Sequence, residues 1–82
     1  MRLSVVIPCY NEKATISAVL TAVENSPYPD KEIIVVDDCS TDGTRELLKA
    51  GLASRIDTLL LHDVNRGKGA ALRTGIAAAD RK

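Results

Sequence analysis

The stretch EIIVVDDCSTDG, residues 32–43, contains an apolar run followed at once by acidic and turn-forming residues. The run at residues 32–36 is short and rich in β-branched side chains, so it predicts a buried β-strand. It ends at Asp37 and Asp38, and residues 39–43 are dense in side chains that favour turns and helix caps. The stretch therefore predicts a strand that ends in a polar loop and leads into a helix.

Two further strand-like runs flank this one in the sequence. Residues 3–8 (LSVVIP) and residues 56–61 (IDTLLL) have the length and composition of strands, and Pro8 closes the first run. Apolar residues recur at helical spacing after each run. Alternation of strand and helix with short connections is typical of an α/β fold with a parallel sheet and right-handed crossovers. We therefore expect a three-layer, Rossmann-like β-α-β-α-β-α arrangement.

The three expected helices are placed by their apolar spacing and their end signals. Asn11 can cap the first helix, and residues 26–30 (SPYPD) break it. The second helix is expected to stop near Gly51, and the third follows residues 65–69 (NRGKG). The apolar positions are Ile16, Val19, Leu20 and Val23 in the first helix, Leu47, Leu48 and Leu52 in the second, and Ala71, Leu72, Gly75, Ile76 and Ala79 on one side of the third.

The composition excludes several classes of protein. Eighty-two residues with 2% aromatic side chains form at most one small domain. The formal net charge is zero, unlike the basic balance of nucleic-acid binders, so we expect no nucleic-acid partner. Because no apolar run reaches the roughly 18 residues of a membrane span and no signal peptide is visible, we expect a cytoplasmic protein. Cys9 and Cys39 are interpreted as reduced, non-catalytic thiols, and His62 as a structural residue.

Polar residues follow the end of each expected strand. Open α/β sheets bind ligands at the carboxyl ends of their strands, so the segments 8–12 (PCYNE), 37–43 (DDCSTDG) and 63–69 (DVNRGKG) are expected to form one site. Tyr10 can stack on a nucleobase or simply cover the start of a helix, and the residue by itself favours neither interpretation. Glu12 can accept hydrogen bonds from ribose hydroxyls or complement a helix N-terminus.

The adjacent carboxylates of Asp37 and Asp38 repel each other at the end of a buried strand unless a donor or a cation lies nearby. An ionised carboxylate only accepts hydrogen bonds, so it can receive the ring N–H of uracil or guanine. We expect one of the pair to contact a ligand in this way while the other braces the loop. The alternative is that both cap the following turn.

Arg66 and Lys68 stand among glycines at the start of the last expected helix. Backbone amides at a helix N-terminus favour an anion, so this is a natural place for a diphosphate. The segment follows the third strand rather than the first and lacks the spacing of a P-loop, so the motif has low specificity. A solvated lysine at a helix start is the alternative interpretation of Lys68.

Taken together, VVIPCYNE (residues 5–12), IVVDDCSTDGT (residues 34–44) and NRGKGAALRTG (residues 65–75) resemble the opening of inverting family-2 glycosyltransferases with the GT-A fold. The most similar branch contains the dolichol-phosphate mannose and glucose synthases. The resemblance covers nearly the whole chain. It implies a truncated GT-A fold in which residues 1–82 are the N-terminal, nucleotide-sugar-binding part of a glycosyltransferase domain.

The resemblance also implies roles for residues from all three motifs. Members of the family transfer a sugar from a nucleoside diphosphate donor, such as a UDP- or GDP-sugar, to an acceptor hydroxyl or a lipid phosphate, usually with Mg²⁺ or Mn²⁺. The matching positions are Pro8, Tyr10 and Glu12 for the nucleoside, Asp37 and Asp38 for the base or ribose, and Arg66 and Lys68 for the diphosphate.

This chain departs from the family pattern at its end. The family's metal-binding Asp-x-Asp follows the third helix, and the catalytic base and acceptor site also belong to the part after Lys82. We therefore expect no catalytic or metal-binding residue in this chain, no tightly bound metal, and no sugar transfer by the chain by itself. The parent enzyme can be membrane-associated. The first strand is expected to lack a partner on one side, so residues 3–8 form an edge suited to self-association.

Two other interpretations stay open. A nucleotide-binding module or a nucleotidyltransferase-like domain, without glycosyl transfer, would carry a glycine-rich basic loop directly after the first strand. The present chain has CYNE there, at residues 9–12. A response-regulator-like domain would carry its acidic pair after the first strand, whereas Asp37 and Asp38 follow the second.

Overall fold

The computed structural model describes residues 3–27 and 30–80, and these form a parallel sheet with the strand order β1-β2-β3. Val6 of the first strand lies opposite Ile34 of the second. All three predicted strands are confirmed, with boundaries that differ by at most two residues. The strands are β1 (Leu3–Cys9), β2 (Lys31–Asp37) and β3 (Thr58–Leu61).

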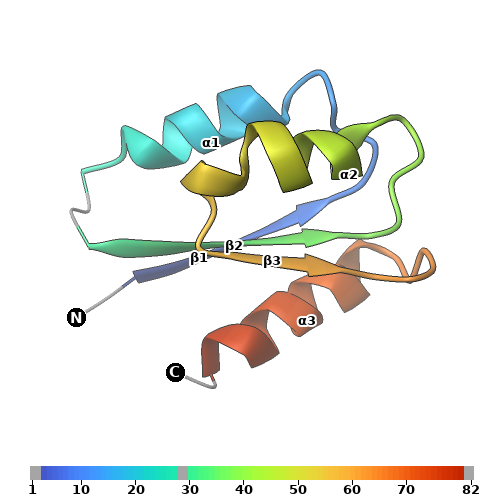
Figure 1. Cartoon of the computed structure of the whole chain (residues 1–82). Coiled ribbons are helices and arrows are strands. Elements are labelled where there is room, and N and C mark those ends of the chain that lie inside the picture. The colour runs from blue at the N-terminus through green and yellow to red at the C-terminus, as the bar shows by residue number, and fades with distance from the viewer. Residues whose placement is uncertain (1–2, 28–29, 81–82) are drawn as a thin grey trace.

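Helices cover both faces of the sheet (Figure 1). On one face lie α1 (Ile16–Glu24) and α2 (Thr44–Glu46), and on the other lies α3 (Lys68–Asp80). The predicted three-layer, Rossmann-like α/β class is therefore confirmed. α1 ends before the segment 26–30 that was predicted to break it, and Tyr28 and Pro29 of that segment lie outside the described residues.

β2 is the centre of the core because both of its faces are covered. Ile33 and Val35 pack with α1, whereas Ile34 and Val36 pack toward α3, and all four are at most 5% exposed. Side chains alternate between the faces of a strand, so a strand covered on both sides is apolar throughout. This is why the unbroken apolar run at residues 33–36 becomes the middle strand.

The first helix begins later than predicted. α1 starts at Ile16, with Thr15 at the N-cap position. Asn11 has a φ of 51°, and its side-chain oxygen accepts a hydrogen bond from the backbone N–H of Thr41 at 2.8 Å. The prediction that Asn11 caps this helix is therefore wrong, because the amide joins two loops instead.

The second helical segment is irregular where a continuous helix was expected. The N–H of Leu52 donates to the C=O of Leu47 at 2.9 Å, which is the five-residue spacing of a π turn. A Cβ at Gly51 would lie 3.0 Å from Leu47 Cδ1, so the wider turn places a glycine where space is short. The successive pieces are α2, a π-helical turn (Leu47–Gly51) and a 3₁₀ turn (Ala53–Arg55).

α3 packs on the sheet through small residues spaced four apart. Ala71 and Gly75 are buried, and Ala79 is half-buried. Leu72 and Ile76, predicted on the same side, are 42% and 47% exposed, so that part of the prediction is wrong. The small residues bring the helix close to the sheet over a narrow stripe, and the larger neighbouring side chains therefore point outward.

Gly75 sets the distance between α3 and the sheet, and we expect Gly75→Ala to destabilise the fold. A Cβ at this position would lie 2.2 Å from Val6 Cγ1 and 3.2 Å from Val36 Cγ2, so helix or strand must shift. Such overpacking costs typically about 1–3 kcal/mol in the free energy of unfolding. Urea denaturation measures this loss.

The matched control is Gly69→Ala in the same helix, where the nearest heavy atom, Arg73 Nη1, would lie 3.5 Å away. This change keeps an ordinary contact and improves helix propensity, so stability should stay equal or rise. Equal stability of Gly69→Ala and Gly75→Ala would contradict the close packing of α3.

Candidate functional site

The loops that follow the three strands meet at one edge of the sheet and enclose a cavity of about 330 Å³. Its walls come from the end of β1 and the loop after it, from the loop after β2, and from the approach to α3 and its first turn. The predicted convergence of three polar segments is therefore observed. The lining residues are Pro8, Cys9, Tyr10, Glu12, Asp38, Asn65, Gly67, Lys68 and Ala71.

The structure brings most of the predicted site residues together at this cavity. Tyr10, Asp38 and Lys68, which come from three different loops, share its wall with Pro8 and Glu12. Two other predicted residues, Asp37 and Arg66, do not belong to the described lining. The reasons are visible in their hydrogen bonds.

Asp37 points into the loop that follows β2 and is fully buried. Its carboxylate accepts the backbone N–H of Ser40 at 3.0 Å and the Ser40 hydroxyl at 2.6 Å. Arg45 Nε lies 3.5 Å from the same carboxylate. Asp37 is therefore the member of the acidic pair that braces the loop, and it does not face the cavity.

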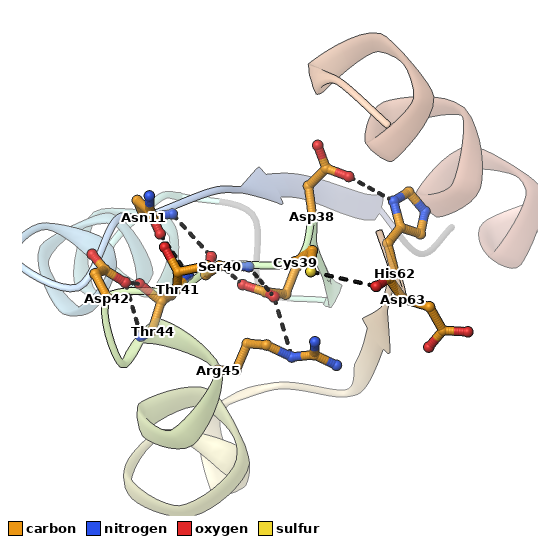
Figure 2. Close-up of polar contacts among 11 residues, drawn as sticks. Asn11, Asp38, Cys39, Ser40, Thr41, Asp42, Thr44, Arg45, His62 and Asp63 are labelled. Carbon is orange, nitrogen blue, oxygen red and sulfur yellow. Dashed lines mark hydrogen bonds and ion pairs between the residues drawn. The ribbon is translucent and has the colours of Figure 1, made fainter. Parts of the chain in front are cut away.

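Asp38 turns the opposite way, toward β3 and the start of α3, and Figure 2 shows it directed at His62. Oδ1 accepts hydrogen bonds from His62 Nδ1 at 2.9 Å and from the backbone N–H of Arg66 at 2.8 Å. Oδ2 accepts the backbone N–H of Gly67 at 2.8 Å. Arg66 thus contributes its main chain to the site, because its amide helps to hold the carboxylate that lines the cavity.

These contacts decide the ionisation of Asp38. Burial works against the charged carboxylate, but the N–H groups of Arg66 and Gly67 and the ring of His62 outweigh it and lower the pKa of Asp38 from its ordinary value. The carboxylate is therefore ionised at neutral pH and only accepts hydrogen bonds.

His62 joins Asp38 to α3 and is buried, with 8% of its surface exposed. Because the ionised Asp38 only accepts, the ring must carry its hydrogen on Nδ1. Nε2 lies 2.9 Å from the hydroxyl of Thr74, which donates to it when the ring is neutral. These two contacts fit the structural role predicted for His62.

The loops after β1 and β2 are joined by hydrogen bonds in both directions. The backbone N–H of Asn11 donates to Ser40 Oγ at 2.9 Å, and the Asn11 side chain accepts the N–H of Thr41 at 2.8 Å (Figure 2). Because Ser40 is also held by Asp37, one network fixes both loops. The wall that presents Tyr10 and Asp38 is built on this network.

Tyr10, Glu12 and Lys68 present side chains to solvent at the rim of the cavity. Tyr10 is 44% exposed, so a large part of its aromatic ring is open to solvent. Glu12 is exposed, and its Oε2 accepts the Thr15 hydroxyl at 2.7 Å. Lys68 is exposed and is the first residue of α3, where the backbone N–H groups of a helix lack intrahelical partners.

Four lining residues were not assigned roles of their own. Cys9, Asn65 and Gly67 lie within the segments 8–12 and 63–69 that were expected to form the site, whereas Ala71 lies outside them. Cys9 gave no chemical signal. Its burial, with the charge of Asp37, raises the pKa of the thiol to about 12, so it remains a neutral wall residue.

The described residues do not fit a metal centre. Within residues 3–27 and 30–80 no group of three or more His, Cys, Asp or Glu side chains is placed to hold a metal ion. The buried acids of the acidic pair are also occupied, because Asp37 and Asp38 accept hydrogen bonds from N–H and O–H donors. We therefore assign no metal ligand among these residues.

An exposed aromatic ring, a buried ionised carboxylate and a lysine at a helix start surround one cavity at the carboxyl edge of a parallel sheet. These features define an α/β domain with a candidate ligand site at the edge where open parallel sheets bind their ligands. Comparison with known proteins identifies the family within this class.

The model of the family described as glycosyl transferase family 2 matches residues 4–82. The chain belongs to this family. It is 38% identical over 77 residues to a poly-beta-1,6-N-acetyl-D-glucosamine synthase of Staphylococcus epidermidis, covering 94% of this chain and 19% of that protein. It is 42% identical over 77 residues to the glycosyltransferase AglE of Haloferax volcanii, covering 89% of this chain and 25% of that protein.

Solved structures agree with the GT-A arrangement of the fold. Residues 1–349 of TarS from S. aureus, in complex with UDP, superpose with a TM-score of 0.83 at 27% identity, covering 98% of this chain and 25% of that one. The mannosyltransferase PcManGT from Pyrobaculum calidifontis, in complex with GDP-Man and Mn²⁺, superposes with a TM-score of 0.81 at 34% identity, covering 94% of this chain and 24% of that one. This chain thus spans about a quarter or less of the length of these relatives.

The lowered pKa of Asp38 makes the fold sensitive to acid. A carboxyl group with a folded pKa below its unfolded value stabilises the fold above the unfolded pKa, and this contribution is lost as pH falls through the folded pKa. The ordinary value is 3.8, so we expect the free energy of unfolding to fall as the pH drops below it. Urea denaturation at a series of pH values measures this loss.

Asp38→Asn is the variant that isolates this effect. It should be less stable than the wild type at pH 7, because an uncharged amide is a weaker acceptor for the three donors, and it should lose less stability below the ordinary carboxyl pKa. Parallel pH profiles for the wild type and Asp38→Asn would show that another group causes the acid sensitivity.

Proposed function

We propose that the cavity binds the nucleoside diphosphate part of a sugar donor. The observation that carries this proposal is the convergence of Tyr10, Asp38 and Lys68 on one cavity, since each suits a different part of such a ligand. A ring, an acceptor-only carboxylate and an ammonium match a base, its N–H and a diphosphate.

Each lining residue is given one role in this proposal. Tyr10 stacks on the base, Asp38 accepts a base N–H, and Glu12 accepts hydrogen bonds from the ribose. Lys68 neutralises part of the diphosphate, helped by the backbone N–H groups at the start of α3. Pro8 shapes the wall beside the base. We give the side chain of Asp37 no ligand contact, because it is buried and bonds to Ser40. The exposed side chain of Arg66 stays a proposed partner of the diphosphate.

For the whole protein we propose transfer of a sugar from a UDP- or GDP-sugar to an acceptor hydroxyl or a lipid phosphate. Family membership and the neighbours solved with UDP or with GDP-Man support this. Residues 1–82 are then the donor-binding, N-terminal part of the enzyme, and for them by themselves we propose binding without transfer. The Mn²⁺ of the PcManGT complex supports use of Mg²⁺ or Mn²⁺, which would neutralise diphosphate charge from outside the described residues.

Place in the cell and branch of the family are also proposals. Cys9 and Cys39 are both free thiols, which fits a reducing compartment such as the cytoplasm. Within the described residues, no helix combines the length and apolar character needed to span a bilayer. Membership of the dolichol-phosphate mannose and glucose synthase branch stays a prediction, which similarity to a mannosyltransferase supports.

Binding of UDP and GDP by the purified chain, measured by calorimetry, tests the proposed site. We expect Tyr10→Ala to remove a stacking contribution on the order of 1–3 kcal/mol, which is a roughly 5- to 150-fold weaker Kd. Lys68→Ala should weaken the binding of nucleoside diphosphates by a comparable factor. It should leave the binding of uncharged nucleosides unchanged, since the partner of Lys68 is the diphosphate.

Lys49→Ala is the matched control, because Lys49 is an exposed lysine in the π turn and does not line the cavity. It should bind UDP and GDP as the wild type does. If the chain binds neither UDP nor GDP, or binds NAD as tightly as it binds them, the proposed donor site is ruled out.

We also propose that the edge of β1 pairs with a second copy of the chain. Among the described residues β1 stands at the end of the strand order and pairs with β2 on one side. Leu3 on this strand is 41% exposed, and α3, which packs on β1, exposes Leu72 and Ile76 nearby. An apolar strand edge of this kind is a template for strand addition.

Light scattering over a range of concentrations measures this self-association. We expect a dimer or larger species to form as concentration rises, and Leu3→Lys to suppress it because a charged side chain protects an edge strand. The control is Val64→Lys, which adds the same charge at an exposed residue that belongs to none of the strands. A monomeric wild type at high concentration would refute the pairing.

A further inference from the structure

Thr74 lies on the side of α3 that faces the sheet, and its hydroxyl reaches a residue outside its own helix. Thr74 Oγ1 lies 2.9 Å from Nε2 of His62, which directly follows β3. A threonine inside a helix often donates its hydroxyl hydrogen to a carbonyl of the preceding turn, as Thr21 of α1 does to Ser17 at 3.0 Å. Thr74 instead joins its helix to the sheet.

The ionised carboxylate of Asp38 sets the direction of both hydrogen bonds of His62. Nδ1 of His62 lies 2.9 Å from Oδ1 of Asp38, and a carboxylate only accepts, so Nδ1 carries the hydrogen. Nε2 of the neutral ring is then an acceptor, and the hydroxyl of Thr74 must donate to it. His62 is buried, so water does not readily replace this donor.

Lys68 lies between two attachments to the same carboxylate. Directly before it, the backbone N–H groups of Arg66 and Gly67 donate to Asp38 at 2.8 Å. Further along the helix, Thr74 reaches the same carboxylate through the buried histidine. Lys68 and Thr74 are about 9 Å apart along the helix axis, at 1.5 Å per residue. The two attachments therefore close a ring that contains the first turns of α3.

Packing by itself leaves α3 room to rotate on the sheet. Its buried residues Ala71 and Gly75 are small, so their contacts limit how closely the helix approaches, and apolar contact has no direction. On the side of β3 the helix also borders a second cavity of about 300 Å³. The lining residues of this second cavity are Leu60, Thr74, Ala77 and Ala78. A hydrogen bond is directional, so the contact of Thr74 with His62 fixes the rotation that packing leaves open.

We propose that Thr74 is a positioning residue for the diphosphate and acts through His62 and α3 on Lys68. The inference rests on the proposed function, because Lys68 is the diphosphate partner there. The hydroxyl holds α3 at the rotation that keeps Lys68 at the wall of the first cavity. Asp38 keeps its three donors whether or not Thr74 bonds to His62, so the nucleoside end of the site keeps its affinity.

Thr74→Val tests the proposal, because valine keeps the β-branched shape and removes the hydroxyl. We expect the dissociation constants of UDP and GDP to rise about 3- to 10-fold in calorimetric titration of the purified chain. Those of uridine and guanosine, measured by competition, should stay unchanged. Thr74→Ser keeps the hydroxyl and should restore the binding of the diphosphates.

Thr21→Val is the matched control, because it removes a helical threonine hydroxyl that is exposed on α1 and does not line the first cavity. It should bind UDP and GDP as the wild type does. Urea denaturation establishes that each variant is folded, and Thr74→Ala takes the place of Thr74→Val if the valine variant does not fold.

A double-mutant cycle shows whether Thr74 acts through Lys68. If it does, Thr74→Val has little further effect on the binding of UDP or GDP once Lys68→Ala is in place, and the two losses do not add. Additive losses would overturn the proposal, because Thr74 would then act on another group.

The binding of the nucleosides separates positioning from a general structural role. If Thr74→Val weakens the nucleosides and their diphosphates by the same factor, the role is merely structural and the proposal is overturned. Unchanged binding of the diphosphates also overturns it, while the donor site itself stands. If the wild type binds neither UDP nor GDP, the proposed function fails and this inference fails with it.

Discussion

Asp38 accepts hydrogen bonds from segments that lie 24 to 29 residues further along the chain. Its carboxylate connects the end of β2 to His62 at the end of β3 and to the amides of Arg66 and Gly67. His62 extends the connection to Thr74 in α3. The carboxylate of Asp38 therefore makes three of the contacts that position the loop before α3 and Lys68, beside the hydrogen bond from Cys39 Sγ to the carbonyl of Asp63 at 3.4 Å. The geometry of the cavity follows from this constraint.

Much of the fold could be predicted because its signals are local. The unbroken apolar run at residues 33–36 predicts a strand buried on both faces, and β2 is that strand. The details of helix packing could not be predicted, because they depend on contacts between residues far apart in the sequence. In the sequence, Gly75 is simply a residue of low helix propensity. Its packing against Val6 is visible only in the structure, and the outward position of Leu72 follows from that packing.

The candidate site was predictable to a similar extent. Parallel strands bring their carboxyl ends to one edge, so the meeting of Tyr10, Asp38 and Lys68 follows from topology. The different contacts of Asp37 and Asp38 do not follow from the topology. Asp37 bonds to Ser40 within its own loop, whereas Asp38 bonds far along the chain, and neighbouring identical side chains give no sign of that difference.

The loops after β1 and β2 are bonded to each other through Asn11 and Ser40, whereas the loop before α3 is held to the loop after β2 mainly by one carboxylate. The first two loops therefore form one hydrogen-bonded unit, and the third is joined to it largely through main-chain amides. Every residue except proline has such an amide, so the side chains at residues 64 and 66 can change while the contacts to Asp38 stay. Gly67 is the exception, because its φ of 92° lies in the region that favours glycine.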